Sequence, residues 1–324
     1  MKALLTFAAR RLLFGLPAIW LLITIVFLMV YLAPGDPLMF IAGEGDISNE
    51  QLLKLRQEYG LDKPLGIQYL LYMKKVVQGD LGYSSRYRSP VLTVIGDRIP
   101  ATVLLMGTSL VIFIGLGLVL GIMASRRPNS AYDLFLSGVA IFGWSVPVFW
   151  LGQLLIIGFA LKLDWFPAQG MLNLRAPSQG IERVLEMIRY LTLPVMALGM
   201  RFLALSTRMT RSSMLQVLRL DYITTARAKG LPERVVLSRH ALPNALLPVI
   251  TIVGMNVGTM LSGSVLTEVV FAWPGMGRLL YDGIFARDYP LIIGIILVVS
   301  IAVVLANLIT DVLYSVVDPR IRYT

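Results

Sequence analysis

The sequence predicts an all-α polytopic membrane protein, because it is rich in apolar residues, poor in charge and divided into long uncharged runs. Of its 324 residues, 56% are hydrophobic and 15% are charged, whereas soluble domains carry about 25% charged residues. A transmembrane helix needs about 20 mostly apolar residues to cross a hydrocarbon core of roughly 30 Å. The chain has no cysteine and one histidine, which excludes a disulfide framework, a catalytic thiolate and most metal sites.

Five runs meet this length requirement, and with a sixth, shorter run they are predicted to be six transmembrane helices. The first has 24 residues, longer than the apolar stretch of about 7–15 residues in a cleaved signal peptide, so it is expected to remain as a helix. The fourth contains one charge, Arg201. The runs are 12–35, 99–125, 134–161, 190–207, 241–267 and 289–310.

The distribution of Lys and Arg predicts that the N- and C-termini are both cytoplasmic. With the N-terminus inside, the inner segments hold 15 of these residues in 80 positions, while the outer segments, without the long one at 36–98, hold 6 in 53. Basic residues collect on the cytoplasmic side of membrane proteins. The net charge of +10 is then cytoplasmic, and it indicates orientation rather than a nucleic-acid partner.

This topology divides the chain into residues 1–35 with the first span, an external cap loop at 36–98, and a core at 99–324 with the other five spans. Two helices are expected in the cap. Ser48 and Gln51 form the start of one that ends near Gly60, and Pro64 opens a second that runs to Gly79.

The segment at 208–245 is too polar to span the membrane and too regular to be a loose loop. Small residues dominate 224–228, Arg227 and Lys229 add positive charge, and Gly230 followed by Pro232 is predicted to end the helix. Such a helix suits docking in a groove of a partner protein. A basic helix that lies on anionic lipid fits the same pattern.

This segment resembles the EAA loop of ABC importer permeases. TTARAKG is followed after nine residues by HALP, so that Ala226, Gly230, Leu242 and Pro243 match the motif in register. Thr224 and Thr225 replace its Glu and first Ala, and His240 replaces its Ile. Further stretches resemble the dipeptide, oligopeptide and nickel branch of these permeases: APGDP at 33–37, GLDKP at 60–64, GDLG at 79–82, RMTRSSML at 208–215, FAWPGMGRLL at 271–280, RDYP at 287–290 and DPRIR near the end.

The resemblance implies the architecture of a type I ABC importer permease with a large external loop between helices 1 and 2. Such a chain is a multi-pass subunit of the bacterial or archaeal plasma (inner) membrane. It forms the translocation path with a second homologous permease, binds two ABC ATPase subunits and receives peptides from an external substrate-binding protein. The residues that it implies for coupling to the ATPase are Asp221, Tyr222, Thr224, Thr225, Ala226, Arg227, Ala228, Lys229, Gly230, Leu242 and Pro243.

The chain itself is not expected to be an enzyme. A phosphate-binding P-loop needs a Gly-Lys pair, and the sequence contains none. We therefore expect no catalytic, cofactor-binding or metal-binding residue here, and we expect ATP and Mg to bind in the partner ATPase subunits.

Three residues are candidates for the translocation path: Arg201, Trp144 and Asn256. Charged residues inside spans are functional candidates by default, although Arg201 also lies near enough to the cytoplasmic end to extend its side chain to water. Trp144 fits either a substrate cavity or ordinary aromatic packing. Trp273 and Glu268 suit anchoring at a membrane interface.

Other functions remain open on the sequence alone. The same machinery imports nickel, glutathione or oligosaccharides in related permeases. A gradient-driven secondary transporter would require protonatable residues at the midplane and an internal repeat, which the sequence does not display. A membrane enzyme would require a catalytic constellation that a single His240 does not provide.

Overall fold

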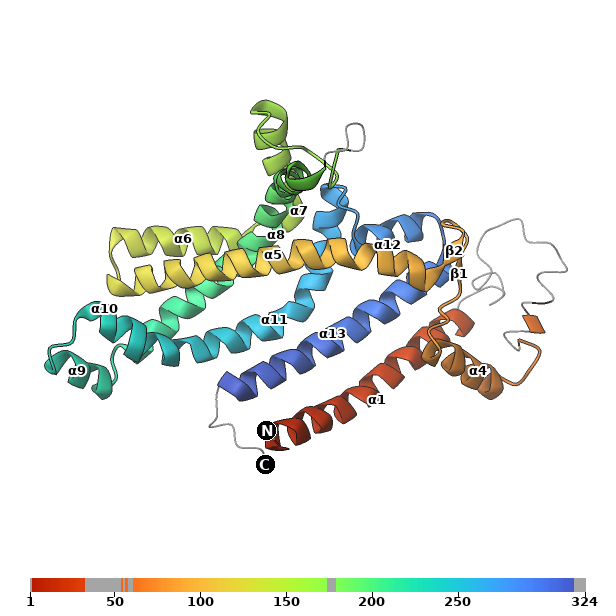
Figure 1. Cartoon of the computed structure of the whole chain (residues 1–324), viewed down its shortest axis with the longest axis horizontal. Helices are drawn as coiled ribbons and strands as arrows, with labels where there is room; N and C mark the ends of the chain where they lie inside the picture. Colours follow the sequence, from red (N-terminus) through yellow and green to blue (C-terminus); the bar gives the residue numbers. More distant parts are fainter. Residues whose placement is uncertain (1, 33–53, 55, 58–60, 174–178, 318–324) are drawn as a thin grey trace. The chain divides into compact units, whose positions relative to one another are not determined.

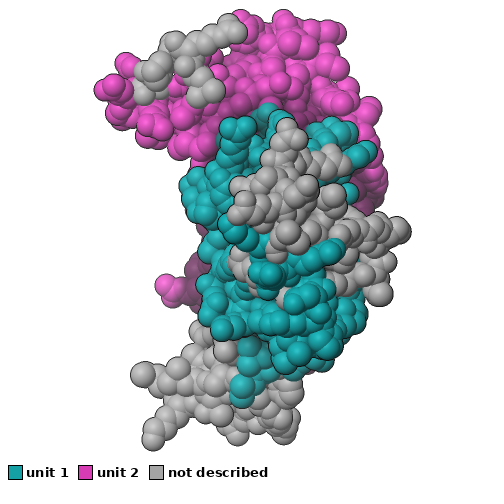
Figure 2. All heavy atoms as spheres, turned by 90° about the vertical axis from the view of Figure 1, so that its right-hand side faces the viewer, with its two compact units in different colours: residues 1–103, 274–308 teal, residues 104–273, 309–324 magenta. Residues whose placement is uncertain are grey.

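In the computed structural model the chain is almost entirely helical (Figure 1). The structure describes residues 2–32, 54, 56–57, 61–173 and 179–317, with the backbone alone for 2–12, 14, 30–32, 251–263 and 311–317. The chain divides into two compact units, which Figure 2 shows in different colours. Unit 1 comprises residues 1–103 and 274–308, and unit 2 comprises residues 104–273 and 309–324.

Unit 1 combines the N-terminal helices with part of the C-terminal region and contains a two-stranded antiparallel sheet. Its elements are α1 (Lys2–Leu32), α4 (Leu65–Val77), β1 (Tyr83–Ser84), β2 (Ser89–Pro90), the first part of α5 (Val91–Arg126), α12 (Met276–Phe285) and most of α13 (Tyr289–Val317).

Helix α4 confirms the second helix predicted for the external cap. It begins directly after Pro64, whose fixed φ angle suits the start of a helix. The helix packs on α1, where the hydroxyls of Thr24 and Tyr69 are 2.8 Å apart and the rings of Phe27 and Tyr69 meet edge to face. The other predicted cap helix, from Ser48 to Gly60, lies outside the described residues.

A buried carboxylate, Asp288, holds the start of α13 to the turn between β1 and β2. Its oxygens accept hydrogen bonds from the Ser84 hydroxyl at 2.5 Å, the Arg86 backbone N–H at 3.1 Å and the Leu291 backbone N–H at 3.3 Å. The last of these caps the N-terminus of α13. Around this centre the ends of α5, α12 and α13 share an apolar core: Val91, Val94, Ile95, Met276, Leu279, Leu291 and Ile295.

Unit 2 is organised around α8, which packs against α11, α6 and α7. Its elements, besides the rest of α5, are α6 (Ala131–Ser145), α7 (Val148–Leu155), the π-helix η1 (Ile156–Lys162), α8 (Gly180–Val217), α9 (Asp221–Ala228), α10 (Glu233–Val235), the π-helix η2 (Val236–Ala241) and α11 (Leu242–Val270).

Small residues allow α5 and α8 to approach closely. A side-chain carbon at Gly117 would overlap Ser206, and one at Gly121 would lie 2.6 Å from the Cβ of Thr210. Association of helices in lipid depends on this kind of close packing. The four-residue spacing of these glycines is thus accounted for by packing within the chain.

The run 134–161, predicted to be a transmembrane helix, is not one straight helix in the structure. The run is broken between α6 and α7, and the two helical parts, Ala131–Ser145 and Val148–Lys162, are bent by 105°. The break falls at Val146 and Pro147. Proline disfavours the helical conformation of the residue before it and cannot donate the next helical hydrogen bond.

Three of the described helices are long and apolar enough to cross a membrane: α5, α8 and Tyr289–Thr310 of α13. The bent pair of α6 and α7–η1 is a fourth if it counts as one span, and Gly15–Met29 of α1 is a shorter apolar helix. The count of six spans and the cytoplasmic location of both termini remain predictions.

Helix α8 is much longer than the run 190–207 predicted for it, and it extends to Val217. The first ten residues of the segment 208–245 therefore belong to α8. The interfacial role predicted for Trp273 and Glu268 is also wrong, because both side chains are fully buried. In the turn that follows α11, the Trp273 N–H donates to the Glu268 carbonyl at 2.8 Å.

Candidate functional site

Helix α9 is fastened to the rest of unit 2 by two buried side chains. Ile223 and Ala226, three residues apart, are 0% and 6% exposed. They share an apolar core with residues from the end of α8, from η2 and from the start of α11: Met214, Val217, Val236, Leu237, Ala241 and Ala245. Because this core joins three elements, α9 is held as a rigid body with them.

The opposite face of α9 is exposed. At 3.6 residues per turn, Asp221, Thr224, Thr225 and Ala228 lie on the side away from Ile223 and Ala226, and all four are exposed. Among the coupling residues predicted from the motif, these offer their side chains to a partner. Ala226 instead contributes its side chain to the core.

The end of α9 is fixed by Gly230 and by an ion pair. Gly230 has a φ of +75°, a left-handed conformation that glycine adopts without strain. The Arg227 guanidinium donates two hydrogen bonds to the Glu233 carboxylate, at 2.8 and 3.2 Å. These bonds hold the pKa of Glu233 below its ordinary value and join α9 to α10. Lys229 follows the helix and is exposed.

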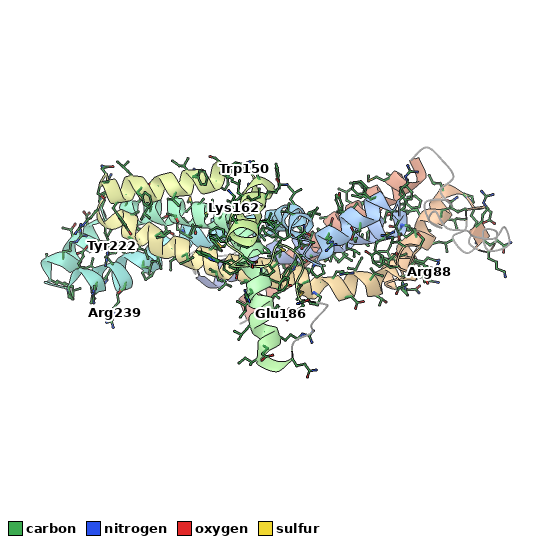
Figure 3. The ribbon with its side chains drawn as sticks, turned by 90° about the horizontal axis from the view of Figure 1, so that it is seen from above. Arg88, Trp150, Lys162, Glu186, Tyr222 and Arg239 are labelled. Atoms are coloured by element: carbon green, nitrogen blue, oxygen red, sulfur yellow. The ribbon has the colours of Figure 1, made fainter. Side chains whose placement is uncertain are left out.

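A polar link connects α9 to the start of α11. Asn244 donates hydrogen bonds to the Tyr222 hydroxyl at 2.9 Å and to the His240 carbonyl at 3.2 Å. Figure 3 labels Tyr222 and Arg239 in this part of the chain. Leu242 packs against the α9 core and Pro243 is exposed. The packing of η2 and Leu242 on this core therefore joins the TTARAKG and HALP parts of the motif.

Two of the three candidates for the translocation path lie together. The Arg201 guanidinium carbon is 4.6 Å from the centre of the Trp144 ring, and that of Arg208 is 5.9 Å from it. Asn256 belongs to α11, and its side chain lies outside the described residues.

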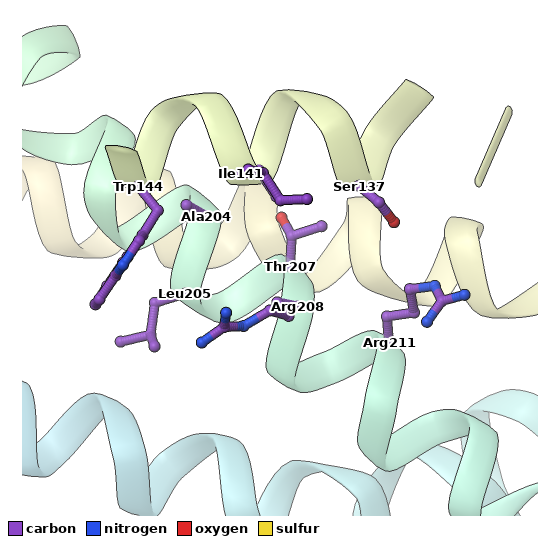
Figure 4. Close-up of a pocket in the computed structure, with 9 residues that line it drawn as sticks. Ser137, Ile141, Trp144, Ala204, Leu205, Thr207, Arg208 and Arg211 are labelled. Carbon is purple, nitrogen blue, oxygen red and sulfur yellow. The ribbon is translucent and has the colours of Figure 1, made fainter. Parts of the chain in front are cut away.

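Trp144 also borders a groove between α6 and α8, with a volume of about 270 Å³. Figure 4 shows the side chains that line this groove. The groove is lined by Ser137, Ala140, Ile141, Trp144, Ala204, Leu205, Thr207, Arg208 and Arg211.

Sequence reasoning missed the ion pair at the edge of this groove. The Arg211 guanidinium donates to both oxygens of Asp133, at 2.5 and 2.6 Å, and Asp133 is 1% exposed. Ser130 caps α6 by accepting from the Asp133 N–H. The signal available in the sequence was an acidic residue in the first turn of an otherwise apolar helix, which needs a partner if it is buried.

Within the described residues, no group of three His, Asp or Glu side chains is placed to hold a metal ion.

The long apolar helices and the EAA-like segment fit a membrane permease of the ABC importer type. The chain belongs to the family of binding-protein-dependent transport system inner membrane components, whose family model matches residues 117–323. A second model, for the N-terminal part of such components, matches residues 4–106. The family resemblance predicted from the sequence is confirmed.

Several curated proteins are similar to the chain over nearly its whole length. The dipeptide transport system permease protein DppB of Alkalihalophilus pseudofirmus is 41% identical, over 99% of this chain and 100% of that protein. DppB of Escherichia coli K12 is 40% identical, over 99% of both chains. The oligopeptide transport system permease protein AppB of Bacillus subtilis is 40% identical, over 97% of this chain and 98% of that protein.

Solved structures show the same fold. A chain of the inward-facing MetNI methionine ABC transporter has a TM-score of 0.56 and 17% sequence identity to this chain. The match covers 69% of this chain and 96% of the MetNI chain. The fold is therefore that of a type I ABC importer permease.

Proposed function

We propose that the chain is a permease subunit that imports di- or oligopeptides. The observation that carries this proposal is the 40–41% identity to dipeptide permeases over 99% of this chain and 99–100% of theirs. Identity that extends through the external loop, the spans and the cytoplasmic segment favours a shared substrate class over nickel, glutathione or oligosaccharide.

The assembly that we propose has a second homologous permease, two ABC ATPase subunits that bind ATP and Mg, and an external binding protein that delivers the peptide. The chain crosses the inner membrane six times, through α1, α5, the α6–η1 pair, α8, α11 and α13, with both termini in the cytoplasm. ATP hydrolysis takes place in the partner subunits.

In this assembly the exposed face of α9 docks on an ATPase subunit. The core around Ile223 and Ala226 and the Tyr222–Asn244 bond support a coupling role, because displacement of α9 would move the ends of α8 and α11 with it. Such rigid-body movement of packed helices is a common way to switch between two states.

Uptake by vesicles that contain the complete importer tests the substrate class. With ATP inside and binding protein outside, we expect accumulation of a labelled dipeptide and none of a labelled nickel chelate. Accumulation of the chelate alone, or peptide uptake driven by a proton gradient without the ATPase subunits, would contradict the proposal.

The coupling role is tested separately with Ala228→Trp, which places a large ring on the exposed face of α9. Because Ala228 is exposed, the fold should be preserved while ATP-driven uptake is lost. Ala131→Trp, at an exposed alanine where α6 begins, is the matched control and should transport normally. Unimpaired uptake by Ala228→Trp would refute docking through this face and leave the substrate assignment intact.

A further inference from the structure

We propose that the groove between α6 and α8 binds an anionic phospholipid, with the headgroup phosphate at Arg201 and Arg208 and an acyl chain along the apolar wall. The inference does not rest on which solute the importer carries. It follows from three properties of the groove: its charge, a buried hydroxyl without a partner, and its apolar lining.

The charge comes from two guanidinium groups on one aromatic ring: Arg208 lines the groove, and Arg201 contacts the Trp144 ring that borders it. Arg201 and Arg208 are seven residues apart, two turns of α8, and both are directed to Trp144 (Figure 4 shows Trp144 and Arg208). Both are exposed, and neither forms an ion pair with any carboxylate in the described part of the chain. The ring holds the guanidinium groups by cation–π contact and leaves their N–H groups available to an oxyanion.

The unpartnered hydroxyl belongs to Thr207, which lines the groove. This side chain is 2% exposed, and its Oγ1 has no hydrogen-bond partner. In Figure 4 it is directed toward α6. Buried polar groups normally have a partner because an unmade hydrogen bond is costly. A headgroup oxygen between Arg208 and α6 would accept from this hydroxyl.

The rest of the lining is apolar, with Ala140, Ile141, Ala204 and Leu205. Leu134, Phe135 and Phe142 lie on the same helix, α6, and expose large apolar side chains. A free inorganic phosphate would leave this wall uncovered, whereas an acyl chain would cover it. Basic pockets between transmembrane helices are a known mode of anionic headgroup binding.

The balance of charge distinguishes a lipid from a peptide in this groove. A dipeptide carries an ammonium group as well as a carboxylate, and the ammonium needs an acidic partner. The nearby acidic residue, Asp133, already receives two hydrogen bonds from Arg211. The groove therefore offers net positive charge together with apolar surface, which fits phosphatidylglycerol better than a zwitterion.

The test titrates the full-length protein in detergent with phosphatidylglycerol or phosphatidylcholine and counts retained lipids by native mass spectrometry. The wild type should prefer phosphatidylglycerol. A variant with Arg201→Gln and Arg208→Gln should bind it at least about tenfold more weakly, the size expected for losing one charge-assisted hydrogen bond. Arg183→Gln, at an exposed arginine near the other end of α8, is the matched control and should bind like the wild type.

Two further variants separate headgroup binding from a general loss of structure. Replacing Arg201 and Arg208 by Lys keeps the charge and should restore most of the preference, which a misfolded protein would not regain. Thr207→Val should weaken phosphatidylglycerol binding and leave phosphatidylcholine binding unchanged. Equal affinity of the wild type for both lipids, or a double Gln variant that binds like Arg183→Gln, would overturn the proposal. Displacement of phosphatidylglycerol by a dipeptide would also overturn it and assign the groove to the substrate.

Discussion

Among the described residues of unit 2, two ion pairs join neighbouring helices, and they differ in burial. Asp133 and Arg211 connect α6 with α8, and their side chains are 2% and 28% exposed. Arg227 and Glu233 connect α9 with α10, and their side chains are 44% and 54% exposed. Both pairs have two hydrogen bonds from a guanidinium to a carboxylate, so the number of these bonds does not distinguish them.

The comparison shows that exposure to solvent determines how much such an ion pair contributes to stability. A charge that remains buried after its partner is removed is strongly destabilising, whereas exposed pairs contribute a median of about 0–1 kcal/mol. The buried pair therefore fixes the arrangement of two long helices. The exposed pair only adjusts the end of a helix that an apolar core already holds.

The largest effect is expected for Asp133→Ala. This change leaves Arg211 without its partner in a mostly buried position and should reduce the free energy of unfolding by about 3 kcal/mol. The melting temperature of the purified protein in detergent measures the loss.

The double variant Asp133→Leu with Arg211→Met is the control for this prediction. It removes both charges and should regain most of the stability, because two apolar side chains often replace a buried pair without loss. If the double variant melted as low as the single one, the loss would come from packing and not from the unpaired charge.

A somewhat smaller effect is expected for Asp288→Ala in unit 1. Asp288 is buried like Asp133, but its oxygens accept from N–H and O–H groups of Ser84, Arg86 and Leu291 rather than from a guanidinium. Its removal leaves no charge unpaired, so we expect a loss of about 2 kcal/mol from the helix cap and the Ser84 bond. Asp288→Asn, which keeps an acceptor for Leu291, should lose less. A loss as large as that of Asp133→Ala would mean that charge is not what separates the two sites.

These two carboxylates also show how far the sequence could predict the structure. Asp288 lies in RDYP, directly before a helix, so local rules place an N-cap there. Its contact with Ser84, 204 residues away, has no local signal. Asp133 and Arg211 are 78 residues apart, and only the packing of α6 on α8 brings them together.

The segment at 208–245 was more predictable than the groove for the same reason. The end of α9 at Gly230 follows from local backbone preference, and α9 was recognisable from its motif. The inward direction of Ala226 depends on a core that includes residues as distant as Ala245. In the groove, Trp144 and Arg201 were each selected as single residues, but Thr207 and Arg208 acquire their roles only when α6 lies against α8.

At the exposed pair, Glu233→Gln should lower the stability of the α9–α10 connection by about 0.5 kcal/mol at neutral pH. Hydrogen exchange of the α9 and α10 amides is the suitable measurement, because the change is local. Global melting should be unaffected, and added salt should reduce the difference between variant and wild type. A drop in global melting like that of Asp133→Ala would show that exposure does not limit this pair.

The smallest effect is the pH dependence of this same pair. The Arg227 hydrogen bonds lower the pKa of Glu233 from its ordinary value of 4.5, so the folded state binds the proton less readily than the unfolded state. The stabilisation is therefore complete above about pH 5 and is lost as the pH falls through the lowered folded-state pKa. The difference in α9 amide protection between wild type and Glu233→Gln should be constant from about pH 7 to about pH 5 and should shrink below about pH 4.5. Asp133 titrates equally in both proteins and cancels from this difference, so a difference that grew on acidification would mean that the folded state raises the pKa of Glu233 instead of lowering it.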